Sequence, residues 1–298
     1  MRVGIIGLGM VGKTIYEGLG SIGNKMHFYD PKYDQSTFID ILNTDCVFVC
    51  VPTNPLSGGK CDISIVDDVL SKLYYHHYQG VVIIKSTVTP GTTRMLSNKY
   101  RTIVSYEKSV DKLKICFVPE FLRERCSLSD FIDNHDVCII GVDPGEFAYD
   151  IIDVVKTVHG NLPKQFKVMS TTEAELSKYF NNVYNAARIT FANGFYEVCK
   201  ALGANYQNIL DAMICRDNIT GHYLKCSDTL RGYGGLCLGK DTLSFCHLIE
   251  SLHKDGMLEI YPEIFKHINN DNAKYARTIL PGMRTEEECF GEKLEIIV

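Results

Sequence analysis

Up to about residue 170 the sequence alternates short β-branched runs with amphipathic segments, and this alternation limits the possible folds more than any other feature. The apolar runs are continuous, as in residues 46–51 and 80–84. Strands of this kind are typical of parallel sheets that helices cover on both faces. Strands are expected at residues 3–6, 25–29, 46–51, 80–84, 114–118, 137–142 and 166–169, with helices such as 63–75 and 147–158 between them.

After this alternation the pattern becomes helical. Residues 173–202 contain no proline, and their apolar positions recur at spacings of three and four, as in Leu176 and Phe180. That spacing predicts one long helix, which Gly203 ends. Shorter helices are expected at residues 206–214, 241–254 and 259–277.

These patterns predict an α/β fold class and two principal domains, which a chain of 298 residues is long enough to form. We expect an N-terminal Rossmann-like parallel-sheet domain over residues 1–168. A helical domain with one long central helix should follow over residues 169–281.

The composition narrows the class of protein. With 45% hydrophobic and 22% charged residues, the chain has the proportions of a soluble globular protein. A net charge of −5 argues against a nucleic-acid or membrane-surface partner, and no apolar stretch reaches the length of a membrane span. The twelve cysteines include no Cys-x-x-Cys pair, which indicates reduced thiols in a cytoplasmic protein rather than disulfides or a metal site.

A glycine-rich turn follows the first expected strand and opens a helical pattern. Gly7, Gly9 and Gly12 form a Gly-x-Gly-x-x-Gly motif around Met10 and Val11. Such glycines allow a tight turn and let the backbone approach a pyrophosphate at the helix N-terminus. The second expected strand runs into Asp30, whose carboxylate suits the ribose hydroxyls of NAD and would repel the 2′-phosphate of NADP. The alternative is a turn that is merely tight; we expect NAD.

A second glycine cluster surrounds one of the cysteines. Residues 232–241 read Gly-Tyr-Gly-Gly-Leu-Cys-Leu-Gly-Lys-Asp and precede an expected helix, so Cys237 can lie at its N-terminus. A thiol there, with Lys240 and Asp241 close by, can become a thiolate nucleophile. For the other cysteines the ordinary interpretation, a small buried apolar side chain, is favoured.

With this segment the sequence resembles the UDP-glucose/GDP-mannose dehydrogenase family, whose cysteine motif reads Gly-aromatic-Gly-Gly-x-Cys-x-Pro-Lys-Asp. The similarity covers essentially the whole chain in the family's order and is greatest to the UDP-glucose branch. The other matching segments are the glycine turn, residues 51–54, 85–92, 119–124 and 173–176, and Lys178 with Asn182.

The resemblance implies an NAD-dependent four-electron oxidation of UDP-glucose to UDP-glucuronate. Lys178, or a water held by Asp241, would remove the proton of the C6 hydroxyl, and Asn182 would help Lys178 to stabilise the developing oxyanion. Cys237 would then form a thiohemiacetal and a thioester, which water hydrolyses with Glu120 as the general base.

The resemblance also implies two binding sets. Around NAD the chain would place Gly7, Gly9, Met10, Val11, Gly12, Asp30, Thr53, Thr87, Glu124 and Lys240. Around the nucleotide sugar it would place Glu120, Phe121, Leu122, Arg123, Glu124, Lys178, Asn182, Tyr223 and Gly234. A homodimer through the long helix is a further implication of the same kind.

Three departures from the family pattern stand out. Gly239 replaces the proline of the cysteine motif, and Asn218 stands where the family has an arginine that reaches a partner's substrate. Residues 282–298 correspond to the start of a third, UDP-binding domain, which the expected organisation otherwise lacks.

Two alternatives stay open. A β-hydroxyacid dehydrogenase also joins a Rossmann domain to a helical one and uses a helix lysine, but it transfers one hydride and leaves the cysteine motif unexplained. A non-catalytic NAD-binding remnant of the family would explain Gly239 and the end of the chain, but not the retained catalytic side chains.

Overall fold

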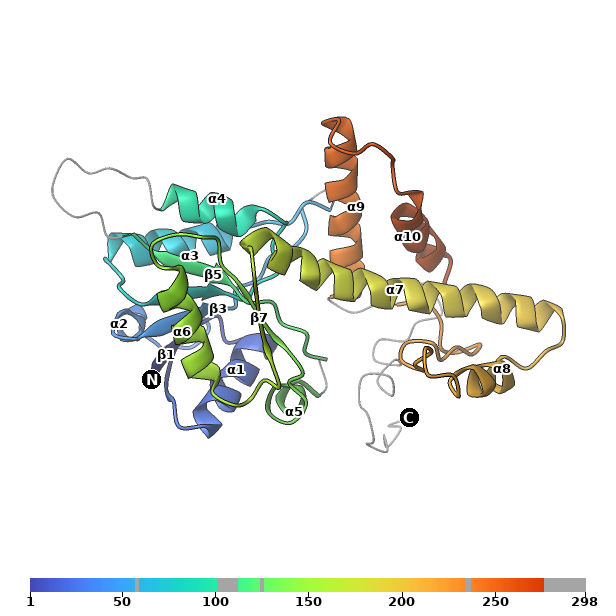
Figure 1. Ribbon diagram of the computed structural model, residues 1–298, viewed down its shortest axis with the longest axis horizontal. Helices are drawn as coiled ribbons and strands as arrows, with labels where there is room; N and C mark the ends of the chain where they lie inside the picture. Colours follow the sequence, from blue (N-terminus) through green and yellow to red (C-terminus); the bar gives the residue numbers. More distant parts are fainter. Residues whose placement is uncertain (57–58, 101–111, 124–125, 234–236, 276–298) are drawn as a thin grey trace. The chain divides into compact units, whose positions relative to one another are not determined.

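The computed structural model of the chain describes residues 1–56, 59–100, 112–123, 126–233 and 237–275. It divides into two compact units (Figure 1). The first unit comprises Met1–Leu56 and Cys61–Lys178. The second comprises the chain from Tyr179 onward together with a short earlier segment that ends at Lys60. In the described residues no helix is long and apolar enough to cross a membrane.

The described residues of the first unit form a seven-stranded sheet in the order β2-β1-β3-β4-β5-β6-β7. β1 has β2 on one side and β3 on the other, so the order of the strands reverses direction between β1 and β3. The strands are β1 (Arg2–Ile6), β2 (Lys25–Tyr29), β3 (Cys46–Val49), β4 (Val81–Ile84), β5 (Lys114–Phe117), β6 (Cys138–Gly141) and β7 (Phe166–Met169).

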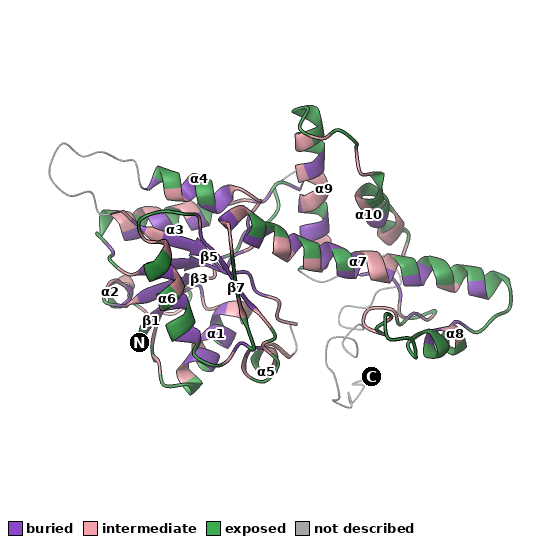
Figure 2. Ribbon diagram, in the orientation of Figure 1, coloured by how far each residue is buried: buried purple, intermediate pink, exposed green. Residues whose placement is uncertain are grey.

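Helices cover both faces of this sheet, as the continuous apolar runs predicted. In β3 the side chains of Val47 and Val49 enter one buried cluster, whereas Cys46 and Phe48 enter the other. Both sides of the central strands are therefore buried (Figure 2). One face packs against α2 (Phe38–Leu42), α3 (Ser64–Tyr75) and α4 (Thr92–Lys99), and the other against α1 (Met10–Ser21), α5 (Ser127–Ile132) and α6 (Ala148–His159).

The α/β fold class is confirmed, but two strands run against the prediction of a parallel sheet, because β7 is parallel to β6 and both are opposite in direction to β1–β5. β6 is antiparallel to β5, with Phe117 paired to Gly141. A parallel strand would need a crossover over the sheet. The helix between β5 and β6 is the short α5, which packs on α1. Its Phe131 ring lies against Gly18 of α1, so closely that a Cβ added to this glycine would lie 2.3 Å from the ring. The two strands therefore meet at their last residues, and β6 approaches β5 from beyond its carboxyl end.

The second unit is helical. The helix α7 (Thr171–Ala201) begins in the first unit and continues into the second. It ends just before Gly203, whose φ of +66° suits a glycine, so the predicted long helix and its stop are confirmed. One buried cluster of this unit joins α7 side chains, such as Val183 and Ile189, to Tyr233 and Ile268, and a second joins the end of α7 to Tyr206 and Leu210 of α8. The remaining helices are α8 (Tyr206–Met213), α9 (Leu238–Lys254) and α10 (Glu263–Tyr275).

A buried histidine in the first unit makes its stability depend on pH. His159 is fully buried among Phe48, Phe131 and Phe166, with its Nδ1 atom 2.8 Å from the carbonyl oxygen of Val155. Burial lowers the pKa of this imidazole to about 3. Between its ordinary pKa of 6.5 and about 3, the unfolded chain binds the proton and the folded chain does not. Stability is therefore full above about pH 6.5 and is lost as the pH falls.

We expect the substitution His159→Phe to remove this dependence, since the aromatic surroundings accept a phenyl ring. In the wild type the free energy of unfolding should fall by about 1.4 kcal/mol per pH unit below pH 6 from this group. Urea unfolding at pH 7.5 and pH 5 measures the difference, with the exposed His267→Phe as the control. If the free energy of unfolding falls equally between pH 7.5 and pH 5 in the His159 variant and the wild type, this imidazole does not cause the pH dependence of stability.

Candidate active site

The glycine turn after β1 has the geometry that dinucleotide binding requires. Gly7 has a φ of +91°, and a Cβ added there would lie 2.7 Å from the carbonyl oxygen of Cys50. A Cβ on Gly12 would lie 2.0 Å from the carbonyl oxygen of Gly7. Gly9, in contrast, has open space at its Cβ position, and it caps α1 without a side-chain hydrogen bond. The N–H groups of the first turn, from Met10 and Val11 onward, are thus available to an anion.

Asp30 follows β2 and lies beside this turn. Its Oδ2 atom accepts a hydrogen bond of 2.8 Å from the N–H of Leu8, and its Oδ1 atom accepts one of 2.9 Å from the N–H of Lys32. The carboxylate is therefore oriented by the backbone, and each oxygen keeps a lone pair for a ribose hydroxyl. The structure thus brings Asp30 together with the glycine turn.

Thr53 and Thr87 follow β3 and β4 at the same edge of the sheet. The hydroxyl of Thr53 donates a hydrogen bond of 2.7 Å to the carbonyl oxygen of Thr87, so the two loops are joined. In open α/β sheets, ligands bind outside the carboxyl ends of the strands where the strand order reverses. Here that place lies between β1 and β3, beside both the glycine turn and Thr53.

Glu120 follows β5 and is buried between two lysines. Its Oε2 atom lies 2.9 Å from the Nζ atom of Lys85, and the Nζ atom of Lys178 donates a hydrogen bond of 2.5 Å to its carbonyl oxygen. Burial by itself would raise the pKa of the Glu120 carboxyl, but the Lys85 ammonium and the Phe121 N–H hold it below its usual range. Glu120 is therefore an ionised carboxylate at neutral pH. The sequence interpretation assigned no role to Lys85, although a lysine directly after a buried strand was a signal that could have found it.

The beginning of α7 fixes Lys178 in place. Three residues earlier on the helix, the buried carboxylate of Glu175 accepts hydrogen bonds from the N–H groups of Gly91 (2.5 Å) and Thr93 (2.7 Å) at the start of α4. A carboxylate at a helix N-terminus is favourable, so this contact ties α7 to the loop that follows Thr87. The Lys178 ammonium also lies 5.8 Å from the centre of the Phe121 ring.

The segment after Glu120 is ordered by an ion pair. The Arg123 guanidinium binds both carboxylate oxygens of Asp130, and the Arg123 N–H donates to the same carboxylate at 2.9 Å. Leu122 packs at the edge of the sheet's second buried cluster. Arg123 is thus held by Asp130 rather than turned outward, and Glu124 lies outside the described residues.

In the second unit, Asn182 and Asp241 form a buried pair. The Nδ2 atom of Asn182 donates a hydrogen bond of 2.6 Å to the Oδ2 atom of Asp241, and both side chains are almost fully buried. The Nζ atom of Lys240 lies 3.0 Å from the other oxygen of Asp241. Lys240, which we expected at the cofactor, is therefore paired with Asp241 here. Asn182 is on α7 and Asp241 is in the first turn of α9, so the pair joins these helices.

Cys237 is the N-cap residue of α9 and is exposed. Its carbonyl oxygen accepts the first helical hydrogen bond, 2.9 Å from the Asp241 N–H. A helix N-terminus favours a thiolate, because the dipole and the unpaired N–H groups stabilise negative charge. Tyr223, in the loop before it, has a φ of +62° and lies 5.8 Å from the Arg188 guanidinium, whereas Gly234 lies outside the described residues.

The other cysteines differ from Cys237 in burial. In the described part of the chain ten cysteines carry reduced thiols, and the exposed ones are Cys215 and Cys237. Burial raises the pKa of the thiols of Cys46, Cys50 and Cys138 to about 12, so these are protonated at neutral pH. Cys126 is disulfide-bonded, so the prediction of reduced thiols is wrong there; scattered spacing argues against a disulfide framework but not against a single bond. The described residues hold no cluster of three or more metal-ligating side chains.

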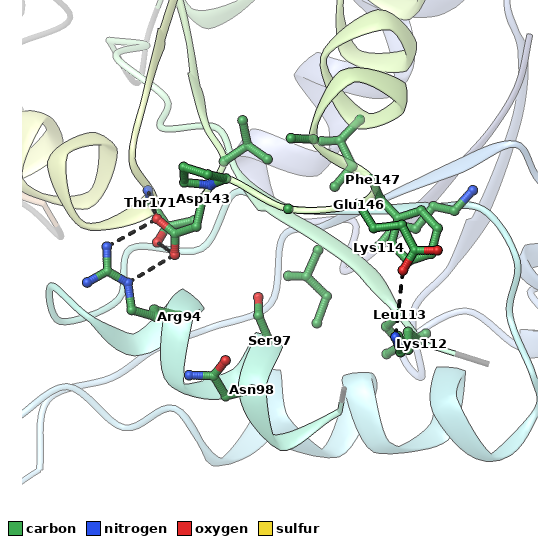
Figure 3. Close-up of a pocket in the computed structure, with 16 residues that line it drawn as sticks. Arg94, Ser97, Asn98, Lys112, Leu113, Lys114, Asp143, Glu146, Phe147 and Thr171 are labelled. Carbon is green, nitrogen blue, oxygen red and sulfur yellow. Dashed lines mark hydrogen bonds and ion pairs between the residues drawn. The ribbon is translucent and has the colours of Figure 1, made fainter. Parts of the chain in front are cut away.

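A separate pocket of the first unit contains none of the predicted site residues. It lies between α4, the start of β5 and the start of α6 (Figure 3). Four of its charged side chains form pairs: Arg94 binds both oxygens of Asp143 at 3.0 and 3.1 Å, and Lys112 lies 3.6 Å from Glu146. Lys114 lies 5.1 Å from the centre of the Phe147 ring. The predicted residues of the first unit that the structure describes lie instead at the carboxyl ends of β1 to β5, and Asn182 and Lys240 contact Asp241 in the second unit.

Gly239 lies in the first turn of α9, where the family has a proline. Its Cβ position is open to 4 Å, and an N–H in the first helical turn has no partner within the helix. A proline there loses no hydrogen bond and restricts the unfolded chain. We expect Gly239→Pro to raise the free energy of unfolding by about 0.4–1 kcal/mol, measured by urea titration. Gly239→Ala serves as the matched control without the ring; a loss of stability in the proline variant alone would contradict the open geometry.

The sheet order, the glycine turn and the oriented Asp30 define a dinucleotide-binding α/β protein joined to a helical domain. Comparison with known proteins specifies the class. The model of the NAD binding domain of the UDP-glucose/GDP-mannose dehydrogenase family matches residues 32–162, and that of the family's central domain matches residues 172–274.

Relatives agree with these matches. The UDP-glucose 6-dehydrogenase of Rickettsia conorii is 30% identical over 218 residues, which are 72% of this chain and 47% of the relative. A UDP-glucose dehydrogenase from the archaeon Pyrobaculum islandicum has a TM-score of 0.76 at 25% identity, covering 93% of this chain and 68% of that one. Mycobacterium tuberculosis 3-hydroxyisobutyrate dehydrogenase shares the fold, with a TM-score of 0.66 at 12% identity, covering 93% of this chain and 94% of that one.

This chain belongs to the UDP-glucose/GDP-mannose dehydrogenase family, and its N-terminal domain is the NAD-binding domain. The family resemblance and the NAD cofactor predicted from the motifs are confirmed. The chain spans about half the length of the curated relatives it matches.

Proposed function

We propose that the chain catalyses the NAD-dependent four-electron oxidation of UDP-glucose to UDP-glucuronate through a covalent intermediate on Cys237. The observation that carries this proposal is the position of Cys237, an exposed thiol at the N-terminus of the long helix α9. A simple alcohol dehydrogenase has no use for a nucleophile there. The buried Asp241–Asn182 pair in the next turn supports the same assignment.

The chain's own residues fit the cofactor. Gly9 and the N-terminus of α1 receive the pyrophosphate, and the Asp30 carboxylate receives the ribose hydroxyls. Thr53 and Thr87 border the same edge of the sheet. When bound, NAD supplies the hydride acceptor for both oxidations.

For the first oxidation the base is Lys178 or a water held by Asp241. As a base, Lys178 takes the proton as a neutral amine; where the water held by Asp241 is the base, the Lys178 ammonium, held by the Glu120 carbonyl, donates to the developing oxyanion. Asn182 orients Asp241 through its amide, so the carboxylate can hold a water in one position.

For the second oxidation the Cys237 sulfur adds to the aldehyde carbon and gives a thiohemiacetal, which is oxidised to a thioester. Water then adds to the thioester carbon while the Glu120 carboxylate takes its proton. The carbon–sulfur bond breaks, and its electron pair returns to the Cys237 sulfur as a thiolate.

Substrate choice is tested by initial rates of NADH formation. UDP-glucose, GDP-mannose and UDP-N-acetylmannosamine are compared at equal concentration with NAD, and UDP-glucose is repeated with NADP. We expect UDP-glucose with NAD to give the highest kcat/KM, with NADP at least about tenfold poorer because Asp30 repels the 2′-phosphate. Faster turnover of GDP-mannose than of UDP-glucose would assign the chain to the GDP-mannose branch of the family.

A second candidate is a two-electron oxidation of a β-hydroxyacid. The shared fold of the mycobacterial 3-hydroxyisobutyrate dehydrogenase, nearly all of which this chain covers, keeps it as the alternative. It requires one hydride transfer and no thiol. Formation of a covalent adduct on Cys237 distinguishes the two.

We also propose that the protein forms a homodimer through α7. The second-unit part of this helix exposes a stripe of apolar side chains, with Phe180 at 76% and Phe191 at 63% exposure. At 100° per residue the stripe falls within one narrow face. Its members are Phe180, Tyr184, Phe191, Phe195 and Val198.

Sedimentation velocity tests the dimer. Because a charge in an apolar interface is costly, Phe191→Lys should shift the protein to monomers, and its apparent mass should fall by half. Tyr149→Lys, which changes an exposed aromatic residue of α6 in the same way, should leave the mass unchanged. A wild-type protein that sediments as a monomer at all concentrations would refute the dimer.

A further inference from the structure

The ion pair between Lys85 and Glu120 is buried almost completely. The side chain of Lys85 is 2% exposed and that of Glu120 is 10% exposed, with 2.9 Å between the Nζ and Oε2 atoms. Lys85 also donates a hydrogen bond of 3.2 Å to the carbonyl oxygen of Pro119. Removing two charges from water costs hydration free energy. A buried ion pair is stable only where the attraction between the charges and their other hydrogen bonds offset that cost.

The fold brings these two side chains together without help from local sequence. β4 and β5 are parallel neighbours, with Ile84 opposite Phe117. Lys85 is the first residue after β4, and Glu120 follows β5 at the same edge, so the lysine reaches across one strand spacing. The Glu120 carboxylate is fixed from its other side by the N–H of Phe121, which donates to Oε1 at 3.0 Å.

Several other titratable groups face this pair. Lys178 of α7 binds the carbonyl oxygen of Glu120, not its carboxylate. The imidazoles of His135 and His159 lie near it, and burial lowers the pKa of both, so they are neutral at pH 7. The thiols of Cys50 and Cys138 are protonated, because burial raises their pKa to about 12. Among the groups that the structure describes, the Lys85 ammonium is therefore the main charge that acts on the carboxylate.

We propose that Lys85 is a positioning residue that keeps the Glu120 carboxylate ionised and oriented for thioester hydrolysis. The proposal rests on the proposed function, in which Glu120 takes a proton from the attacking water. Without the ammonium, a carboxyl group buried among neutral side chains takes up a proton and can no longer accept one. Lys85 thereby sets the pH at which the last step can run.

The test compares Lys85→Met, which keeps the length of the side chain, with Lys85→Arg, which keeps the charge. The ionisation of Glu120 is followed in the ligand-free protein by carbon-13 NMR of labelled glutamate carboxyls, with Glu120→Gln identifying the signal. We expect Glu120 in the Met variant to titrate at about pH 8, as a buried carboxyl without a charged partner can, so that only about a tenth of it is ionised at pH 7. The Arg variant should titrate close to the wild type.

The second readout is the rate of release of the Cys237 adduct, followed by intact mass after rapid mixing with UDP-glucose and NAD. In Lys85→Met the adduct should accumulate at pH 7 with release at least about tenfold slower, and raising the pH should restore release. Recovery at high pH separates this effect from a misplaced site, which pH does not repair. The double variant Lys85→Met/Glu120→Gln, with both charges removed, should unfold at a higher urea concentration than Lys85→Met alone.

The two hypotheses fail differently. If the wild type and Glu120→Gln form no adduct, the proposed function fails, while the Glu120 titration still decides whether Lys85 controls this carboxylate. If Glu120 in Lys85→Met titrates as in the wild type, or the adduct is released at the wild-type rate at pH 7, the role of Lys85 is overturned.

Discussion

Replacement of Cys237 by serine is expected to reduce UDP-glucuronate formation at least about 10³-fold, since no thioester can form. Serine has nearly the same size and still caps α9, so the fold should be unaffected. The hydroxyl is not ionised at neutral pH and is a poor nucleophile without an adjacent base. Chromatography of the products measures the loss, and the release of the intermediate aldehyde shows how far the reaction proceeds.

Cys215→Ser is the matched control, because Cys215 is the other exposed reduced thiol in the described part of the chain. It should form acid at the wild-type rate. NAD affinity, measured by calorimetry, should be unchanged in both variants. Normal acid formation by Cys237→Ser would remove this residue from the mechanism.

Gly12→Ala is expected to weaken NAD binding at least about 100-fold and to destabilise the N-terminal domain. The new methyl group would lie 2.0 Å from the carbonyl oxygen of Gly7, an atom of the backbone that cannot rotate away. The turn must therefore open, which separates α1 from β1 and moves the helix N-terminus away from the pyrophosphate site. Strain of this kind costs about 1–3 kcal/mol.

Gly9→Ala separates the two effects. Its Cβ position has no neighbour within 4 Å, so the free energy of unfolding should stay close to that of the wild type. NAD affinity should still fall, because the methyl group occupies the space that the pyrophosphate needs. Calorimetry with NAD and urea unfolding measure both quantities. Wild-type NAD affinity in Gly12→Ala would contradict the assignment of this turn.

Most of the fold could be predicted from the sequence, because its signals are local. The strand at residues 25–29 and the strand at residues 166–169 have the predicted bounds, and Gly203 follows the long helix as expected. The direction of β6 could not be predicted, since it depends on where α5 packs. That packing is set by the contact between Phe131 and Gly18, which lie far apart in the sequence.

For the candidate site, the sequence could indicate local features but not the partners of charged side chains. The glycine turn and Asp30 are local features, and the structure places them together. The partners of the charged residues depend on tertiary structure. Lys85 meets Glu120 across neighbouring strands, and Asp130 holds Arg123, which the sequence pattern had assigned to the substrate. Lys240 binds Asp241 rather than lying unpaired for the cofactor.

The number of NADH molecules formed per UDP-glucose consumed tests the central claim most directly. The chain is incubated with limiting UDP-glucose and excess NAD, and NADH absorbance is compared with the remaining sugar nucleotide. A four-electron oxidation through Cys237 predicts a ratio of two. A ratio of one would contradict it in favour of the two-electron dehydrogenase, and the absence of NADH with NAD still bound would identify a non-catalytic member of the family.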